Sequence, residues 1–221
     1  MKNAGLPNRN TLREDYERYT GIRALITKDL KDYLEERFGD LPFRPTIKGR
    51  PKDFSSFFKK YLKLLKSTGA SESPPITDLI GVRIVCPVLE DLAVVEDAVK
   101  RVFTVIELER KGEHYSFKEF GYESTHLLVK IPEEIIKNRG TCNCEVAEIQ
   151  IRTILQDAWA EVEHELVYKA EFTPFDDPLK RKLAAVNASL SLADIIFQEI
   201  RGYQRQLNRE LGKRRNSFYK K

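Results

Sequence analysis

Basic and hydroxyl side chains gather just before and along one predicted helix. They are Lys48, Arg50, Lys52, Ser56, Lys59, Lys60, Lys63 and Lys66. The first N–H groups of a helix, together with lysines one turn further on, supply the several donors that a polyphosphate needs. This segment therefore predicts a triphosphate site, and the alternative is an ordinary solvated lysine face opposite an apolar stripe.

Two carboxylates stand out against apolar surroundings. Asp78 lies at the entrance of the apolar run Leu79–Val85, and Glu148 lies midway along a segment whose alternate residues are Ala and Ile. Mg²⁺ prefers oxygen ligands and takes few of them from protein. Two carboxylates facing a lysine-rich phosphate site therefore suit a magnesium-bound nucleotide. Taken singly, each residue is equally compatible with a solvent-facing sheet edge.

A third pattern runs from Gly121 to His126, where a glycine turn leads into an alternating segment. It places the ring of Tyr122 at the mouth of a predicted strand, in a position suited to stacking on a nucleobase. The alternatives are a strand-end aromatic packed on its neighbours for Tyr122 and a hydrogen-bonded, partly buried imidazole for His126.

Helices must position these side chains. The spacing of apolar residues predicts helices over residues 12–38, 54–65, 92–102, 153–169 and 179–200. Asp53 occupies the N-cap position of the second helix. The last helix has a heptad-like apolar seam, which would pack either on the body of the domain or on a second copy of the chain.

Strands are predicted over residues 79–85, 103–108, 124–131 and 144–152. The first two, with the helix between them, form a β-α-β outline. The last two alternate, so each presents an apolar face to the core and a polar face to the chemistry. The polar faces include His126, Glu148 and Gln150.

Composition limits the class of protein. A chain of 221 residues with 41% hydrophobic residues suits one core with extensions, or at most two small domains. The longest apolar runs fall short of the roughly 20 residues that span a bilayer, and the polar N-terminus lacks a signal-peptide segment. We therefore expect a cytoplasmic protein without a membrane segment. Three cysteines favour reduced thiols over a disulfide framework, and a net charge of +4 says little about partners.

At these residues the sequence resembles the synthetase domain of the RelA/SpoT alarmone synthetases, and its length is similar to that of the small, single-domain members. The matching stretches occur in the family's order: Gly49–Lys52 with Ser56 and Lys60, Asp78–Ile84, Gly121–His126, Glu148–Thr153, and Asp157–Glu161 leading to Lys169. Each stretch is weak alone, but all of them in order make a specific signal.

The resemblance implies an α/β fold of the α+β type: a mixed central sheet of about five strands flanked by helices, nucleotidyltransferase-like, with long N- and C-terminal helices. The implied domains are an N-terminal helical extension (1–42), the synthetase domain (43–172) and a C-terminal helix with a basic tail (173–221). That helix is implied to assemble a homo-oligomer, a dimer or tetramer.

The implied activity is transfer of the β,γ-pyrophosphate of ATP to the ribose 3′-hydroxyl of GDP or GTP, which yields guanosine tetra- or pentaphosphate and AMP. By matching position, Arg50 and Arg83 sandwich the adenine. The phosphate ligands are Lys52, Ser56 and Lys60, with Lys63 further along the same helix. Since no hydrolase-type domain precedes this segment, synthesis without hydrolysis is expected.

On the acceptor side the resemblance implies that Tyr122 stacks on guanine, with Lys118, His126 and Gln150 nearby. Asp157 is placed to read the guanine edge, since a carboxylate accepts from guanine N1–H and its exocyclic amine. Asp78 is implied to be the principal Mg²⁺ ligand. Glu148 completes the metal site or activates the 3′-hydroxyl, and these two roles stay open.

Two alternatives remain from the sequence. The first is a pyrophosphokinase for another acceptor, such as an adenine nucleotide or the 3′ end of tRNA. The basic tail Lys213–Arg215 makes RNA conceivable, but tRNA recognition needs a broader basic surface. The second is a binding module that has lost catalysis, which the intact set of chemical side chains disfavours. The long connection from Lys130 to Cys144 leaves the shape of the acceptor pocket open.

Overall fold

The computed structural model describes residues 8–68, 75–112, 123–137, 139, 144–163, 165–166 and 177–218. In chain order the elements are α1 (Arg9–Arg18), α2 (Thr20–Arg37), β1 (Thr46–Pro51), α3 (Phe54–Thr68), β2 (Ile80–Cys86), α4 (Leu89–Val102), β3 (Val105–Lys111), β4 (Ser124–Lys130), α5 (Glu133–Lys137), β5 (Val146–Thr153), α6 (Ile154–Glu163) and α7 (Asp177–Phe218).

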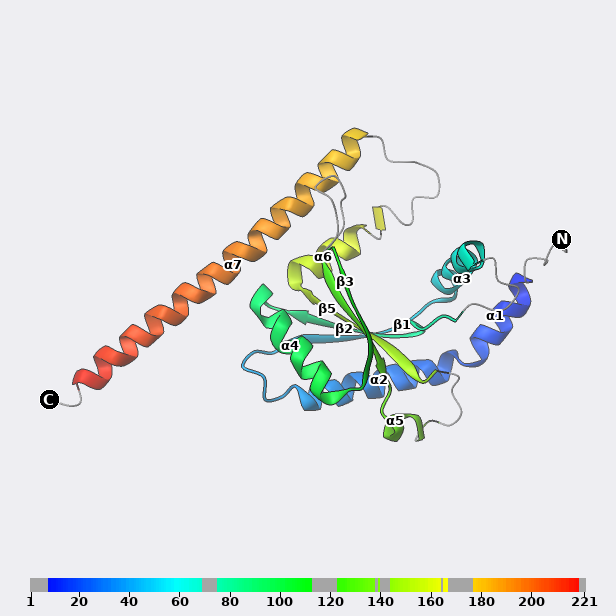
Figure 1. Cartoon of the computed structure of the whole chain (residues 1–221), viewed down its shortest axis with the longest axis horizontal. Helices are drawn as coiled ribbons and strands as arrows, with labels where there is room; N and C mark the ends of the chain where they lie inside the picture. Colours follow the sequence, from blue (N-terminus) through cyan, green and yellow to red (C-terminus); the bar gives the residue numbers. More distant parts are fainter. Residues whose placement is uncertain are drawn as a thin grey trace.

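A five-stranded sheet in the order β1-β2-β5-β4-β3 forms the centre of the described structure (Figure 1). Strands β2 and β5 are parallel, and every other neighbouring pair is antiparallel. The prediction of a mixed sheet of about five strands flanked by helices is confirmed. The β-α-β outline also holds, but β5 and β4 lie between β2 and β3.

One face of this sheet is the hydrophobic core, covered by α2, α4 and α5. The alternation predicted for β4 and β5 is confirmed, because Leu127, Val129, Ala147 and Ile149 are completely buried on this face. Helix α2 belongs to the same core. It approaches β1 so closely that a Cβ on Gly49 would lie 2.8 Å from Cγ2 of Thr27, which explains the glycine.

Strand β1 is one element that the sequence patterns miss, as is the short helix α5. Only Ile47 is buried along β1, and the strand contains Gly49 and ends at Pro51, so it has no alternating apolar signal. Its place at the edge of the sheet explains this composition, since an edge strand tolerates proline and buries little. Pairing with β2, rather than local propensity, makes it a strand.

Three predicted boundaries need correction. The helix expected over residues 179–200 runs from Asp177 to Phe218. The helix expected over residues 12–38 is two helices, α1 and α2, which meet at Tyr19. The strand expected over 103–108 begins later and runs to Lys111. Phe103 instead caps α4 and is buried in the core, so its apolar character reflects packing rather than strand structure.

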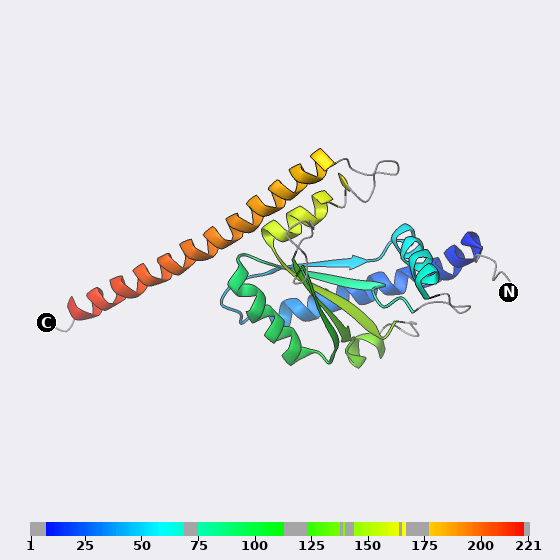
Figure 2. The same cartoon turned by 45° about the horizontal axis from the view of Figure 1, so that its top comes forward.

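Helix α7 extends far beyond the sheet, and its far end lies on the opposite side of the molecule from α1 (Figures 1 and 2). It is fastened to the body by polar contacts. Thr153 Oγ1 donates to Asp194 Oδ2 at 2.6 Å, and Arg201 Nη1 lies 2.5 Å from Asp91 Oδ2. Arg205 pairs with Glu90 beyond them. The predicted long C-terminal helix is therefore present.

Much of the apolar seam of α7 is exposed. The large apolar side chains of α7 that are at least 40% exposed are Leu179, Val186, Leu192, Ile195, Ile196, Phe197, Ile200, Tyr203, Leu207 and Leu211. By length and composition alone, Pro178–Arg215 could cross a membrane. This is a weak indication, since helices that pack on protein pass the same test. The absence of a membrane segment stays a prediction.

Candidate active site

The register of the strands gathers polar side chains on the face opposite the core. Lys48 pairs with Arg83 across β1 and β2, and Gln150 of β5 pairs with Arg83 on the other side. His126 of β4 is paired with the same glutamine. Residues paired directly across strands project to the same face. The chemical side chains predicted on separate segments therefore form one row.

A cavity of about 780 Å³ opens over this row, between the sheet, α3 and α6, and its volume suits a nucleotide-sized ligand. Ten of the predicted site residues line it: Arg50, Lys52, Ser56, Lys60, Lys63, Asp78, Arg83, His126, Glu148 and Gln150. Predicted ATP-side and acceptor-side residues thus share one cavity. Lys118 and Tyr122 lie outside the described residues.

Asp78 is the meeting point of the basic residues. Its Oδ2 accepts from Lys52 Nζ at 2.6 Å and lies 2.9 Å from Lys60 Nζ. Burial would raise the pKa of Asp78, but the hydrogen bonds and charges of the two lysines outweigh it and hold the pKa below 3.8. The carboxylate is therefore ionised at neutral pH. Its Oδ1 is buried without a hydrogen-bond partner.

Glu148 is held by its strand neighbours. Its Oε1 lies 2.9 Å from Nδ1 of His126, and Oε2 accepts from Nε2 of Gln150 at 2.7 Å. Burial opposes ionisation, but His126 and Gln150 together lower the pKa of Glu148 from 4.5 to about 2. His126 is itself only 5% exposed, and its Nε2 has no partner. Both side chains are thus fixed in orientation at the wall of the cavity.

The two carboxylates fit a magnesium ion. Both line the same cavity, both are ionised, and the unpartnered Oδ1 of Asp78 is a buried oxygen with no protein donor. Within the described ranges, no group of three or more His, Cys, Asp or Glu residues is arranged to hold a metal. Mg²⁺ commonly takes one or two carboxylates and completes its shell with substrate phosphates and water.

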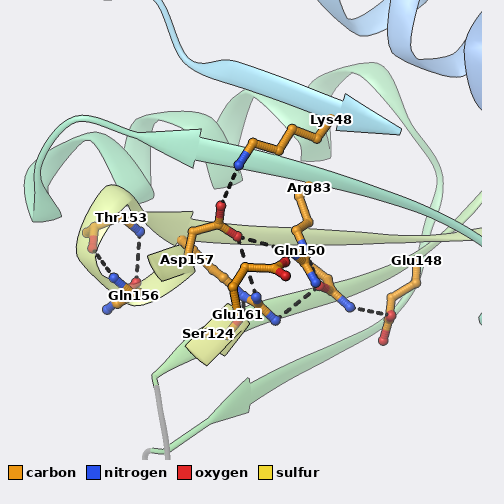
Figure 3. Close-up of polar contacts among 10 residues, drawn as sticks. Lys48, Arg83, Ser124, Glu148, Gln150, Thr153, Gln156, Asp157 and Glu161 are labelled. Atoms are coloured by element: carbon orange, nitrogen blue, oxygen red, sulfur yellow. Dashed lines mark hydrogen bonds and ion pairs between the residues drawn. The ribbon is translucent and has the colours of Figure 1, made fainter. Parts of the chain in front are cut away.

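A second polar network lies at the β1 side of the row, around Asp157 (Figure 3). Asp157 is 4% exposed, and its two oxygens accept from Lys48 Nζ at 2.7 Å and Arg83 Nη1 at 3.3 Å. Arg83 also pairs with Glu161 of α6. Asp157 does not line the cavity among the described residues. In this structure it orients Arg83, and its reading of guanine stays a prediction.

Some cavity residues were absent from the predicted set. They are Leu64, Lys111, Arg152, Ala160 and Glu163, whereas Lys59, which also lines the cavity, belongs to the basic segment singled out in the sequence. Lys111 is the most informative of them, because it pairs in register with Ser124 and its charge helps to lower the pKa of Glu148. The outer part of β3 is charged and lacks apolar alternation, so only its pairing with β4 reveals that this lysine reaches the site.

The connection between β4 and β5 folds away from the cavity in its described part. Helix α5 packs on α2, with Ile135 buried in the core, and Arg139 Nε donates to Asp29 Oδ2 at 2.6 Å. These contacts lie on the core side of the sheet, opposite the polar row. The long connection noted in the sequence is therefore accounted for by packing on α2 in the residues that the structure describes.

Residues 49–173 match the family described as the region found in RelA / SpoT proteins. The chain belongs to this family. It is 30% identical over 200 residues to the GTP pyrophosphokinase YjbM of Bacillus subtilis, covering 89% of this chain and 86% of the relative. The resemblance inferred from the motifs is thus confirmed.

Two solved structures of a Bacillus subtilis protein have a similar fold and contain bound nucleotides. Small alarmone synthetase 1 bound to its product pppGpp superposes with a TM-score of 0.69 at 26% identity, covering 87% of this chain and 99% of that one. The same protein bound to AMPCPP gives a TM-score of 0.63 at 25% identity, covering 87% and 99%. The fold assigned to this chain is therefore one that binds both kinds of nucleotide in a relative.

Proposed function

We propose that this chain is a GTP pyrophosphokinase that transfers the β,γ-pyrophosphate of ATP to the ribose 3′-hydroxyl of GDP or GTP, giving guanosine tetra- or pentaphosphate and AMP. The observation that carries the proposal is the shared cavity. Asp78 with its lysines occupies one part and Glu148 with His126 another. The relatives named above, a GTP pyrophosphokinase and a synthetase bound to pppGpp, support the substrate class.

The ATP half of the site is cationic. Arg50 and Arg83 line the cavity beside β2 and suit the two faces of adenine by cation–π stacking. Lys52, Lys60 and Lys63 suit the triphosphate, with Ser56 at the start of α3. Phosphoryl-type transfer depends mainly on positioning and on neutralising charge, and this lysine cluster supplies both.

The acceptor half positions the attacking hydroxyl. The 3′-oxygen attacks the β-phosphorus of ATP, the new oxygen–phosphorus bond forms, and the bond from the β-phosphorus to the oxygen of the α-phosphate breaks, so AMP leaves with the electron pair. Glu148 is fixed by His126 and Gln150 and accepts the hydrogen bond of the hydroxyl, whose proton is lost during attack. Tyr122 and Lys118 are proposed to hold the guanine nucleotide.

Asp78 and Glu148 would hold Mg²⁺ in this scheme. Bound there, the ion would neutralise the charge that develops on the phosphates and on the attacking oxygen. Lys52 and Lys60, which pair with Asp78 in this structure, would then also bind the phosphates. The unpartnered Oδ1 of Asp78 supports this assignment.

The proposal is tested by incubating the purified protein with γ-labelled ATP and Mg²⁺, adding GDP, GTP, ATP or tRNA in turn. Label is expected in GDP or GTP, with one AMP formed for each product. Label in tRNA or an adenine nucleotide would show that the acceptor is not a guanine nucleotide, although the reaction type would stand. No label in any acceptor would overturn the enzymatic assignment and favour a binding module.

We also infer that the chain assembles through α7 as a cytoplasmic homo-oligomer. The support is the exposed apolar seam, together with the polar contacts of Asp194 and Arg201 to the body, which suit packing on protein. Wild-type protein is expected in the cytosolic fraction, with a light-scattering mass of at least twice 25.6 kDa. The double variant Ile196→Lys, Ile200→Lys is expected to be a monomer. A monomeric or membrane-bound wild type would contradict this inference.

A further inference from the structure

Helix α3, which carries the ATP-side lysines, depends on α1 for its position. Its aromatic stripe lies outside the hydrophobic core of the sheet and packs instead on α1, against the ring of Tyr16 and under the guanidinium groups of Arg9 and Arg13. The ring centroid of Tyr16 lies 4.7 Å from that of Phe57 and 5.6 Å from that of Phe54. Figure 1 shows α3 standing beside α1, beyond the end of β1.

Tyr16 also contacts the backbone of the site directly. Its hydroxyl donates to the carbonyl oxygen of Lys52. The N–H of Lys52 donates to Leu79 O at 3.1 Å. Both the N–H and the carbonyl group of Lys52 are therefore hydrogen-bonded, one to Leu79 and the other to Tyr16. The side chain of Lys52 then reaches Asp78. The hydroxyl of Tyr16 thus helps to hold the backbone of Lys52, whose side chain pairs with Asp78.

A buried arginine fixes Tyr16 in turn. Arg23 of α2 is 3% exposed, its Nη2 donates to Tyr16 O at 3.1 Å, and its guanidinium carbon lies 4.2 Å from the centroid of the tyrosine ring. Burial raises the pKa of the Tyr16 phenol, although Arg23 opposes this, so the hydroxyl remains a donor at neutral pH. Tyr16 is therefore held on both sides, by α2 and by the start of α3.

We propose that Tyr16 is a positioning residue for ATP, which sets Lys52 and α3 in place and makes the N-terminal helices part of the phosphate site. This inference rests on the proposed function, because the ligand of Lys52 is taken to be the ATP triphosphate. Tyr16 does not line the cavity. It acts through the Lys52 carbonyl and the aromatic packing of α3.

The test compares Tyr16→Phe with Tyr33→Phe, a matched change on α2. Tyr33 also packs on a phenylalanine, Phe103, and lies under an arginine, Arg37, but on the core side of the molecule. For each variant we would measure KM for ATP, KM for GDP, kcat, the melting temperature, and the affinity for AMPCPP by calorimetry.

Tyr16→Phe leaves the partly buried Lys52 carbonyl without this donor, and one hydrogen bond of this kind corresponds to about a fivefold change. We expect KM for ATP and the Kd of AMPCPP to rise about fivefold, with KM for GDP unchanged. Tyr16→Leu, which also removes the tilted aromatic contacts with Phe54 and Phe57, is expected to raise both by a further factor of about five. Tyr33→Phe should leave all constants unchanged.

Unchanged AMPCPP affinity in Tyr16→Phe would overturn the inference. So would an equal rise of KM for ATP and GDP together with a lower melting temperature, since that pattern reports general destabilisation. Failure of the proposed function is a different result: wild-type protein would then transfer no pyrophosphate, while the calorimetric comparison of the variants would still decide the role of Tyr16.

Discussion

The two halves of the active site are built differently. On the acceptor side, His126, Glu148 and Gln150 lie on two adjacent strands, and hydrogen bonds link their side chains. On the ATP side, Lys52 follows an edge strand, Lys60 lies on α3 and Asp78 precedes β2. The first group is fixed by sheet register. The second is assembled from three segments: pairing of β1 with β2 brings Lys52 to Asp78, whereas Lys60 reaches Asp78 from a separate helix.

This difference indicates which kind of substitution should disturb each half. A side chain on a central strand keeps its direction as long as the sheet is formed, because pairing fixes register and face. A side chain on α3 depends on the docking of α3 against α1, where Tyr16 contacts two of its aromatic rings. We therefore expect changes in the acceptor half to affect the chemical step, and changes around α3 to affect ATP binding.

The largest effect is expected for Glu148→Gln. Loss of this charge removes the acceptor for the 3′-hydroxyl proton and half of the carboxylate pair, so kcat should fall by about 10³ or more. The measurement is transfer of labelled pyrophosphate to GDP, with circular dichroism to confirm the fold. Glu133→Gln, on the exposed surface of α5, is the matched control. A loss smaller than tenfold would break the assignment of the chemical step to this half.

Asp78→Asn is expected to lower kcat/KM by about 10² to 10³, because it removes a charge that Lys52, Lys60 and Mg²⁺ would share. The Mg²⁺ concentration that gives half-maximal activity should also rise. Asp29→Asn removes a comparable aspartate–cation pair, with Arg139 at 2.6 Å, away from the cavity and should change neither quantity. An unchanged Mg²⁺ requirement in Asp78→Asn would argue against its role as a metal ligand.

Lys60→Ala should raise KM for ATP about tenfold, with a smaller change in kcat, because it removes one phosphate ligand but leaves the acceptor half intact. Lys66→Ala is the control on the same helix, since Lys66 does not line the cavity. Steady-state kinetics with ATP and GDP varied in turn separates the two halves. Equal effects of both substitutions would mean that α3 contributes only general positive charge.

A different kind of effect, on stability rather than activity, is expected at low pH. The pKa of Glu148 in the folded protein is about 2, below its ordinary value of 4.5, so the unfolded chain binds more protons between these values. The stabilisation by Glu148 is present above pH 4.5 and is lost as pH falls toward 2. It amounts to at most about 3 kcal/mol.

Urea unfolding at a series of pH values measures this contribution. Wild type should be more stable than Glu148→Gln above pH 4.5, and the two should converge toward pH 2. A constant difference across the range would show that the contacts of His126 and Gln150 do not lower the pKa of Glu148 in solution.

Several features of the site follow from local sequence. Alternation along residues 124–131 and 144–152 correctly predicts which side chains enter the core and which form the polar row. The N-cap role of Asp53 is confirmed, because its Oδ1 accepts from Ser56 N at 2.9 Å. Such features depend on residues only a few positions apart, so they can be predicted without knowing the tertiary structure.

The sequence by itself thus determined the chemistry: which carboxylates, lysines and arginines are available, on which faces of their elements, and in the order typical of the RelA/SpoT family. Tertiary structure alone decided how they meet. It made 46–51 an edge strand, joined Asp78 to Lys52 and Lys60, brought Lys111 to the cavity and docked α3 on Tyr16. The physical reason is range: periodicity and capping are local, whereas strand pairing, ion pairs and aromatic packing join residues that the chain brings together only by folding.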